Sequence, residues 1–501
     1  MRRQMTSPLL RSATAAVLVT TIGCAFGSTN VTPPAVTPVS SRGAQAMAPA
    51  TRAVLDSMAS ARDADRPDSA AKALWRPVPL QVNHVRDLAW LDVVRDSQLV
   101  ALVRTAIENN RDLRVAQARV REFRAERGVA ASDFFPSIYA DASASRNKGI
   151  VNTPSPVQYD VVRVAADLSW ELDFWGRIRR NTQAANYDVL AREEDVRATV
   201  LTLVSDVATA YLQLRAADEN LHVAEQTLQS RQATLDLARR RFQQGLISEL
   251  DVRQFEAQVA DPAARVADFA RQRTQFENAL SVLTGTPPQT IARGNALESV
   301  VQAVTIPDSL PGDLVARRPD VVRAQRDVQA AGARVGVAIA NRLPSVTLTG
   351  AYGTQRPKFD KLFTPQGEIY TLQAGISLPL FTGGRLLSEQ RAAQARAEQA
   401  QATYEQTVLS ALREASDALA GVRLGKDQLV AQETQVRALE TAYSLAQRRY
   451  ATGISSYLEV LDAQRGLFTA QLGLVQVEQQ YLVSVVQLYK AFGGSWNERQ
   501  Q

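Results

Sequence analysis

The side chains that most often perform catalysis or bind metal ions are scarce in this sequence. The 501 residues include two histidines, His84 and His222, and one cysteine, Cys24. One cysteine excludes an intrachain disulfide and any cysteine-rich metal site, and two histidines leave little for acid–base chemistry. The only spacing close to a glycine-rich nucleotide motif, Gly332 with Gly336, falls in a helical pattern and does not follow a strand. We therefore expect no enzyme activity and no cofactor.

The composition is that of a globular protein with a mild positive charge. Lysine and arginine number 57 against 51 aspartate and glutamate, for a net charge of +6. This excess is too small to indicate nucleic-acid binding by itself. With 45% hydrophobic and 22% charged residues, the chain is not disordered as a whole.

The N-terminal segment is typical of an exported lipoprotein. A basic start precedes a short apolar run, residues 13–22, which falls short of the ~20 residues that a membrane-spanning helix needs. The run ends in TIGC, whose last residue is Cys24, and this resembles a bacterial lipobox. We expect residues 1–23 to be a signal peptide, Cys24 to carry a covalent lipid, and residues 24–74 to be a flexible linker. The alternative is an unlipidated cysteine within an ordinary signal peptide.

The sequence contains an internal repeat, in which one structural unit occurs twice. The segment Phe135-Pro136-Ser137 recurs as Leu343-Pro344-Ser345, 208 positions later (344 minus 136). The same offset holds without a gap across both halves. It relates Asp112 to Asp320, Gly128 to Gly336, Gly176-Arg177 to Gly384-Arg385, Arg240-Arg241 to Arg448-Arg449, Gly245 to Gly453, Leu250 to Leu458, and Gly285 to Gly493.

Each copy contains two segments in which apolar and polar residues alternate. They lie at residues 137–145 and 162–174 in the first copy, and near residues 346–352 and 370–380 in the second. Alternation over about ten residues is typical of membrane β-barrel strands, and also of a half-buried sheet in a soluble protein. Because four strands are too few to close a barrel, strands in a membrane would require two or three chains.

Long helical patterns surround each strand pair. A first helix is expected at residues 98–131, and residues 178–241 contain neither glycine nor proline. At ~1.5 Å per residue, the second stretch forms a helix approaching roughly 100 Å. A turn at Gly245 and a returning helix follow, and the pattern repeats around Gly453. Helices of this length predict a coiled-coil assembly. Pro262 lies inside the first returning helix, where we expect a bend.

Several segments together resemble a known family. They are Arg317-Arg318-Pro319-Asp320, Leu343-Pro344-Ser345, Trp170-Glu171-Leu172-Asp173, Leu378-Pro379-Leu380-Phe381 with Gly383-Gly384-Arg385, and Tyr450 to Arg465. With them the chain, over residues 75–494, resembles the TolC-like outer-membrane efflux lipoproteins. These proteins are the exit ducts of tripartite drug-efflux and type I secretion systems.

The resemblance implies an α+β fold assembled as a homotrimer. Four strands per chain would form a trimeric outer-membrane β-barrel, continued by a long periplasmic α-helical barrel and built from two ungapped structural repeats. Repeat one would span residues 75–285 and repeat two residues 317–494, each with a helix, two strands and a long helical hairpin. Residues 286–316 would form an inter-repeat equatorial segment, and residues 495–501 a C-terminal tail.

The resemblance also implies a periplasmic gate. By position, Leu458 corresponds to an apolar constriction, Glu459 and Asp462 to acidic rings, and Arg465 to the gate partner of Asp462. Leu458 and Asp462 share one helical face, acidic rings favour cations, and apolar constrictions gate by dewetting. The alternative for Asp462 and Arg465 is an ordinary surface pair three residues apart.

The turns between the long helices resemble the tips that dock an adaptor protein in this family. The residues are Gly245, Leu246, Ser248, Gly453, Ile454 and Ser456. The same residues also suit a simpler role, in which glycine ends one helix and serine caps the next.

The expected function is the outer-membrane exit duct of a tripartite efflux pump, which passively conducts drugs or other small molecules. The duct would be a lipid-anchored homotrimer in the outer membrane that projects into the periplasm, contacts a periplasmic adaptor, and reaches the inner-membrane pump indirectly. No nucleic-acid partner is expected. Two alternatives stay open: an exit duct for type I protein secretion, and a non-conducting structural lipoprotein that spans the periplasm.

Overall fold

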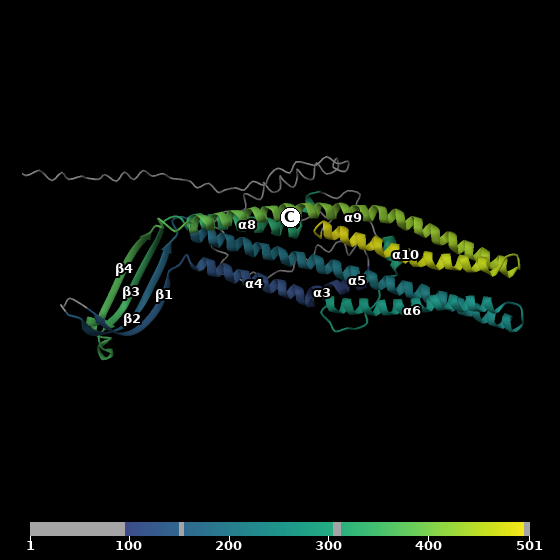
Figure 1. Cartoon of the computed structure of the whole chain (residues 1–501), viewed down its shortest axis with the longest axis horizontal. Coiled ribbons are helices and arrows are strands. Elements are labelled where there is room, and N and C mark those ends of the chain that lie inside the picture. Colours follow the sequence, from purple (N-terminus) through teal and green to yellow (C-terminus); the bar gives the residue numbers. More distant parts are fainter. Residues whose placement is uncertain (1–95, 150–154, 304–311, 495–501) are drawn as a thin grey trace, which may run out of the picture. The chain divides into compact units, whose positions relative to one another are not determined.

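The computed structural model describes residues 96–149, 155–303 and 312–494, which form helices and one four-stranded sheet (Figure 1). The predicted signal peptide, the lipidation site Cys24, the linker and the tail at 495–501 lie outside the described residues. No helix in the described ranges has the length and apolar character needed to cross a bilayer.

The elements follow the order expected for two copies of one unit. The first copy contains α3 (Ser97–Asn109), α4 (Arg111–Ser132), β1 (Ser137–Gly149), β2 (Val157–Leu172), α5 (Arg177–Gln243) and α6 (Glu249–Leu283). The short elements α7 (Leu297–Ala303) and η5 (Gly312–Arg317) follow. The second copy contains α8 (Pro319–Ala340), β3 (Ser345–Arg356), η6 (Phe359–Lys361), η7 (Pro365–Gly367), β4 (Glu368–Ser377), α9 (Arg385–Ala451) and α10 (Tyr457–Ala491).

The corresponding helices of the two copies, from α4 onward in the first copy and α8 onward in the second, have equal lengths. Helices α5 and α9 each contain 67 residues, α6 and α10 each contain 35, and α4 and α8 each contain 22. Their first residues differ by the offset read from the sequence, as with Arg177 and Arg385. We call residues related by this offset equivalent.

The single helix expected at residues 98–131 is wrong, because Asn110 divides it into α3 and α4. Asn110 has an extended backbone (φ −58°, ψ 134°), and its side-chain oxygen accepts a hydrogen bond from Leu113 N at 3.0 Å. An asparagine at this position satisfies an N–H group at the start of α4. The apolar spacing continues across the break, which is why periodicity alone did not show it.

The strand boundaries also differ from the sequence prediction. Strand β1 continues to Gly149, and β2 spans Val157–Leu172 where residues 162–174 were expected. Strand β4 ends at Ser377, before Leu378-Pro379-Leu380. Proline has no N–H to donate to a neighbouring strand, which accounts for an end before Pro379.

The sheet is antiparallel throughout, in the order β1-β2-β3-β4, so β1 and β4 are its edges (Figure 1). The β2–β3 contact joins the two copies and pairs Ala166 with Tyr352 and Ala165 with Gly353. A Cβ added to Gly353 would lie 2.2 Å from Val164 O, so the close approach of these strands requires glycine.

The start of α5 is fixed by acidic residues at the end of β2 and just after it. The Asp173 carboxylate accepts hydrogen bonds from the backbone N–H groups of Ile178 (3.1 Å) and Arg179 (2.9 Å). Glu171 forms an ion pair with Arg177 at 2.7 Å. A negative side chain at a helix N-terminus is favourable because it meets unpaired N–H groups and the positive end of the helix dipole. The acidic residues of the Trp-Glu-Leu-Asp segment therefore have a structural role.

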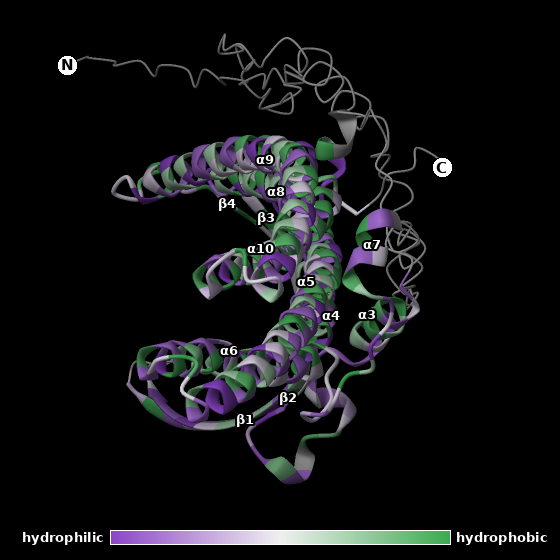
Figure 2. Cartoon of the chain, turned by 90° about the vertical axis from the view of Figure 1, so that its right-hand side faces the viewer, coloured by the Kyte–Doolittle hydropathy of each residue, from purple (hydrophilic) through white to green (hydrophobic). Residues whose placement is uncertain are grey.

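The long helices pair as the hairpins α5–α6 and α9–α10 (Figure 1). Hydrophobic and hydrophilic residues are mixed along their whole length (Figure 2). Helix α6 remains continuous through Pro262, whose side chain is buried. One large buried cluster collects side chains from both copies, including Leu99, Tyr211, Leu280, Leu482 and Leu488.

A buried polar network joins α3, α5 and the segment before α7. The Tyr211 hydroxyl, 1% exposed, donates to Asp96 Oδ2 and accepts from Gly294 N, both at 2.9 Å. Asp96 also caps α3 by accepting from Gln98 N and Leu99 N. Burial, followed by the Asp96 charge, raises the pKa of Tyr211 above its usual value. The phenol therefore stays protonated and can donate to the carboxylate.

Replacing Tyr211 by Phe should lower the free energy of unfolding by about 1–3 kcal/mol, because the Asp96 carboxylate and the Gly294 N–H lose a partner. Thermal unfolding of the purified protein in detergent measures this effect. Tyr443→Phe is the control, since its hydroxyl accepts a hydrogen bond from the exposed side chain of Gln447. Equal destabilisation by both variants would contradict the importance of the network.

Candidate functional site

The two hairpin turns have the same backbone geometry. Gly245 and Gly453 have φ values of +72° and +75°, a region that glycine enters without the usual steric penalty. Leu246 N donates to Arg241 O at 2.9 Å, and Ile454 N makes the equivalent bond at 3.0 Å. This pattern ends a helix with a left-handed glycine.

Serine begins the returning helix in each hairpin. Ser248 accepts a hydrogen bond from Asp251 N, while the Asp251 carboxylate accepts from Ser248 N, so the two residues form a capping box. Ser456 occupies the equivalent N-cap position without a side-chain cap bond. Helix termination by glycine and a serine at the N-cap are therefore confirmed at both turns. Adaptor docking by these residues stays a prediction.

Both turns expose large apolar side chains. Leu246 is 68% exposed and Ile454 70%, while the equivalent pair Leu250 and Leu458 are each 67% exposed. Exposed apolar side chains that gather in one region typically mark a surface that meets another molecule or another copy. The turns are thus suited to contact, in addition to reversing the chain.

The predicted gate residues all lie in the first turns of α10, and within the chain Arg465 has a partner other than Asp462. Leu458 and Asp462 are exposed, and Glu459 pairs with Arg449 across the turn at 3.4 Å. Arg465 Nε donates to Gln258 Oε1 on α6 at 3.1 Å. Among the described residues, no ion pair joins Asp462 to Arg465. Arg465 therefore connects the two hairpins, and gating by these residues stays a prediction.

A buried arginine extends this connection. Arg231 on α5 is 2% exposed, and its Nη1 donates to Gln258 O at 2.7 Å. Its guanidinium carbon lies 5.3 Å from the centre of the Phe468 ring on α10. Its Nη1 also lies 3.4 Å from Oδ2 of Asp261. Burial, as the largest cause, lowers the pKa of Arg231. Cation–π contacts of this type gain strength when they are desolvated.

A second layer of contacts lies nearer the turns. Arg241 Nη1 on α5 donates to the Tyr450 hydroxyl on α9 at 2.7 Å. The Tyr450 ring meets Tyr457 at 5.3 Å, and Tyr457 meets Phe255 on α6 at 4.3 Å. Burial raises the pKa of Tyr457 to about 12. We call the two layers the hairpin junction, consisting of Arg231, Arg241, Phe255, Gln258, Tyr450, Tyr457, Arg465 and Phe468.

Sequence reasoning missed most of the hairpin junction. Only Arg465 was predicted to be a site residue, with Asp462 as its partner. The repeated arginine pairs before each turn were a usable signal, because Arg241 belongs to one of them. Arg231 and Gln258 have no such signal, since they lie within long helices rich in arginine and glutamine.

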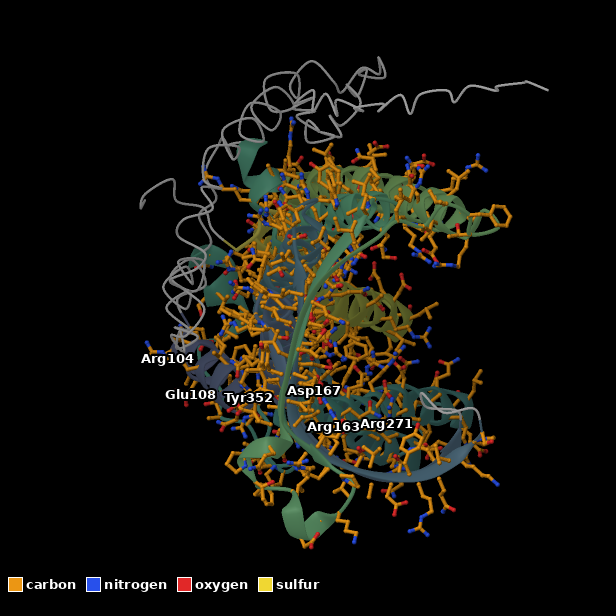
Figure 3. The ribbon with its side chains drawn as sticks, turned by 90° about the vertical axis from the view of Figure 1, so that its left-hand side faces the viewer. Arg104, Glu108, Arg163, Asp167, Arg271 and Tyr352 are labelled. Carbon is orange, nitrogen blue, oxygen red and sulfur yellow. The ribbon has the colours of Figure 1, made fainter. Side chains whose placement is uncertain are left out.

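The sheet carries paired charges on β2. Arg163 and Asp167 form a two-bond ion pair, at 2.5 and 3.1 Å, and lie side by side in Figure 3. Arg146 on β1 pairs with Asp160 on β2 at 2.7 Å. Each arginine meets its carboxylate through two hydrogen bonds, the geometry in which such pairs are strongest. Arg163 and Asp167 lie on the polar face that the alternating pattern predicted, whereas Asp160, an odd number of positions away on the same strand, lies on the opposite face.

A buried carboxyl group lies on α10. Glu478 is 6% exposed. Burial, followed by the nearby carboxylates of Glu298, Glu219 and Glu433 on α7, α5 and α9, raises its pKa to about 7. In the described ranges, no set of three or more histidine, cysteine, aspartate or glutamate residues could hold a metal ion. Burial and the like charges around it thus favour the protonated form of the Glu478 carboxyl group.

Known proteins resemble this chain in sequence. The family model described as "Outer membrane efflux protein" matches residues 102–286 and 310–494. The toluene efflux pump outer membrane protein TtgC of Pseudomonas putida is 35% identical over 82% of this chain and 86% of its own length. The probable outer membrane lipoprotein SilC of Salmonella typhimurium is 31% identical over 83% and 90%.

A solved structure is similar to this chain in fold. The structure of the outer-membrane channel OprN matches it with a TM-score of 0.75 and 31% sequence identity, over 81% of this chain and 92% of the OprN chain. The fold is thus that of outer-membrane channels, and the family consists of efflux proteins, not enzymes. The chain belongs to the outer membrane efflux protein family, and it is located in the outer membrane.

Stability should fall as pH rises through the titration range of Glu478. Between the ordinary pKa of about 4.5 and the folded value of about 7, the folded chain keeps a proton that the unfolded chain releases. Glu478→Gln removes this loss, on the order of 2 kcal/mol per chain, and should make the protein more stable than wild type at pH 8. Melting temperatures from pH 5 to 8 measure the difference. Glu440→Gln, on the exposed surface of α9, is the control, and parallel curves for wild type and Glu478→Gln would disprove the assignment.

Proposed function

We propose that the chain forms the outer-membrane exit duct of a tripartite efflux pump. The observation that carries this proposal is the four-stranded sheet with two open edges in a chain of this family. Unpaired backbone groups cost several kcal/mol each in lipid, so the edges must pair. Three chains would close a twelve-stranded barrel, continued by the long helices as an α-helical barrel.

The small-molecule role is favoured over the alternatives by the relatives. TtgC is described as part of a toluene efflux pump, and SrpC of Pseudomonas putida as part of a solvent efflux pump. We infer that this chain also passes small organic molecules, passively, with energy supplied by the pump. Type I protein secretion remains the second candidate, and a non-conducting lipoprotein the third. The naming of SilC as a lipoprotein supports a lipid on Cys24.

The exposed turns suit the contact with a periplasmic adaptor. Leu246 and Ile454 occupy equivalent positions and protrude from the two turns. In a trimer they would form a ring of six apolar points at the periplasmic end. Apolar anchors of this kind typically dominate the energy of a protein interface.

The hairpin junction suits the closed state of the duct. It ties α9–α10 to α5–α6 through Arg465, Arg241 and Tyr450. Opening a ring of helices requires these hairpins to separate, so the junction opposes opening. Leu458 and Asp462, tripled by trimer symmetry, would form the apolar and acidic rings at the constriction.

Loss of the junction should open the channel. In planar lipid bilayers we expect small, mostly closed events from the wild type, and severalfold greater open time from Arg465→Ala/Tyr450→Phe. Arg437→Ala, which removes a surface pair with Glu433 on α9, is the control and should behave as wild type.

Each other outcome is informative. No conductance from folded, inserted protein would contradict the duct and favour the structural lipoprotein. Conductance that the double variant leaves unchanged would keep the duct and remove the junction as its closing contact.

A further inference from the structure

Four helices form a row next to the sheet, and the two outer ones are α4 and α9. Helix α4 packs on α5, α5 packs on α8, and α8 packs on α9 (Figure 1). The central contact, between α5 and α8, joins the first copy to the second. By the repeat offset, α9 is equivalent to α5 and α4 is equivalent to α8. The α5–α8 contact is therefore a template for the contact that α9 would make with α4 of another chain.

One face of α8 meets α5 in this template. Arg334 pairs with Asp188 at 2.5 Å, and Asp327 lies 3.7 Å from Arg192. Ala330 lies between Asp327 and Arg334 on the same helical face, and it is 0% exposed. The contact thus combines ion pairs with the close packing of a small side chain.

The equivalent face of α4 is exposed within the chain. Glu126, the equivalent of Arg334, is exposed. Two valines on the same helical face, Val115 and Val129, are 50% and 71% exposed. Apolar side chains that are exposed together typically mark a surface that meets another molecule.

A repeated glycine shows the same difference between the two helices. A Cβ added to Gly336 on α8 would lie 3.2 Å from Cγ of Arg180 on α5. A Cβ added to the equivalent Gly128 on α4 would meet nothing within 4 Å. The residue equivalent to Arg180 is Ser388, which is exposed on α9. Helix α4 thus has the glycine of a close helix contact, and the position is open within the chain.

The charges of the template pair are exchanged on the two outer helices. Asp188 on α5 is equivalent to Arg396 on α9, and Arg334 on α8 is equivalent to Glu126 on α4. Among the described residues, neither Glu126 nor Arg396 forms an ion pair. Contact between two α4 faces would bring two glutamates to one interface, and contact between two α9 faces would bring two arginines. Only α4 with α9 of another chain combines opposite charges, which favours that contact over the other two.

We propose that the exposed face of α9 docks on α4 of a second copy of the chain, in the register of α5 on α8, and that an ion pair between Arg396 and Glu126 selects this contact. Because the two faces differ, the contact is heterologous, and it repeats around a ring instead of forming a two-fold dimer. The inference rests on the proposed ring of chains and identifies the helix contact that determines how the chains follow one another.

Cysteines at Gly128 and Ser388 test the register. Protein with Gly128→Cys and Ser388→Cys, oxidised mildly in outer membranes, should give disulfide-linked dimers and trimers on denaturing gels, because the equivalent pair lies in contact within the chain. Gly128→Cys with Ala395→Cys, about two turns further along α9, should give about tenfold less of these species, since a disulfide tolerates little displacement. Each single variant, which keeps Cys24, should give neither species.

Charge reversal tests the ion pair. Arg396→Glu and Glu126→Arg should each lower the temperature at which the trimer dissociates in detergent, measured by light scattering, because like charges then face each other at every contact between chains. The variant with both reversals restores opposite charges and should recover the lost temperature. Arg423→Glu is the control, since Arg423 is exposed and lies about 7.5 turns further along α9, on the opposite face.

The outcomes separate this contact from the proposed duct. Wild-type trimers in detergent, together with no disulfide between Gly128→Cys and Ser388→Cys, would overturn the docking of α9 on α4 and leave the duct in place. A double reversal no more stable than the single reversals would overturn the ion pair. Wild-type protein that forms no trimer would contradict the duct and this contact together.

Discussion

The structure depends on one constraint, the unpaired backbone of the two edge strands. Strands β1 and β4 each have a neighbour on one side only within the chain. Lipid offers no hydrogen bonds in place of water, so a sheet with open edges cannot lie in a membrane alone. In the proposed barrel, closure by further copies would satisfy both edges at once. The long helices that follow β2 and β4 would then form part of the same ring, where apolar side chains that are exposed on the single chain could pack against a neighbour.

The internal repeat supplies a template for that closure. Within the chain, β2 of the first copy pairs with β3 of the second, and Ala166 lies opposite Tyr352. The residue equivalent to Ala166 is Ala374 on β4, and the residue equivalent to Tyr352 is Ala144 on β1. If β4 of one chain pairs with β1 of the next as β2 pairs with β3, Ala374 lies opposite Ala144 of the neighbouring chain. The repeat also predicts which helices of neighbouring chains would lie side by side. Arg334 on α8 pairs with Asp188 on α5 at 2.5 Å, and the equivalent positions, Glu126 and Arg396, again have opposite charges.

The sequence predicted most of the architecture and few of the side-chain contacts between the two hairpins. Repeat offset, strand alternation and the glycine turns are local patterns, and they place the elements correctly to within a few residues. The break at Asn110 was missed because apolar spacing continues across it, and the end of β4 because the alternation runs on past Pro379. The partner of Arg465 is Gln258, 207 positions away. Such a contact depends on how two hairpins pack, which no pattern within one helix records.

The most direct measurement of ring closure is a cross-link between the edge strands of neighbouring chains. A variant with Ala144→Cys and Ala374→Cys, oxidised mildly in outer membranes, should give covalent dimers and trimers on denaturing gels and nothing larger. Ala140→Cys with Ala374→Cys, displaced by four residues along β1, should cross-link poorly, and each single variant should give no ladder. A ladder that continues beyond three chains, or equal cross-linking by the displaced pair, would contradict a closed trimeric barrel in this register.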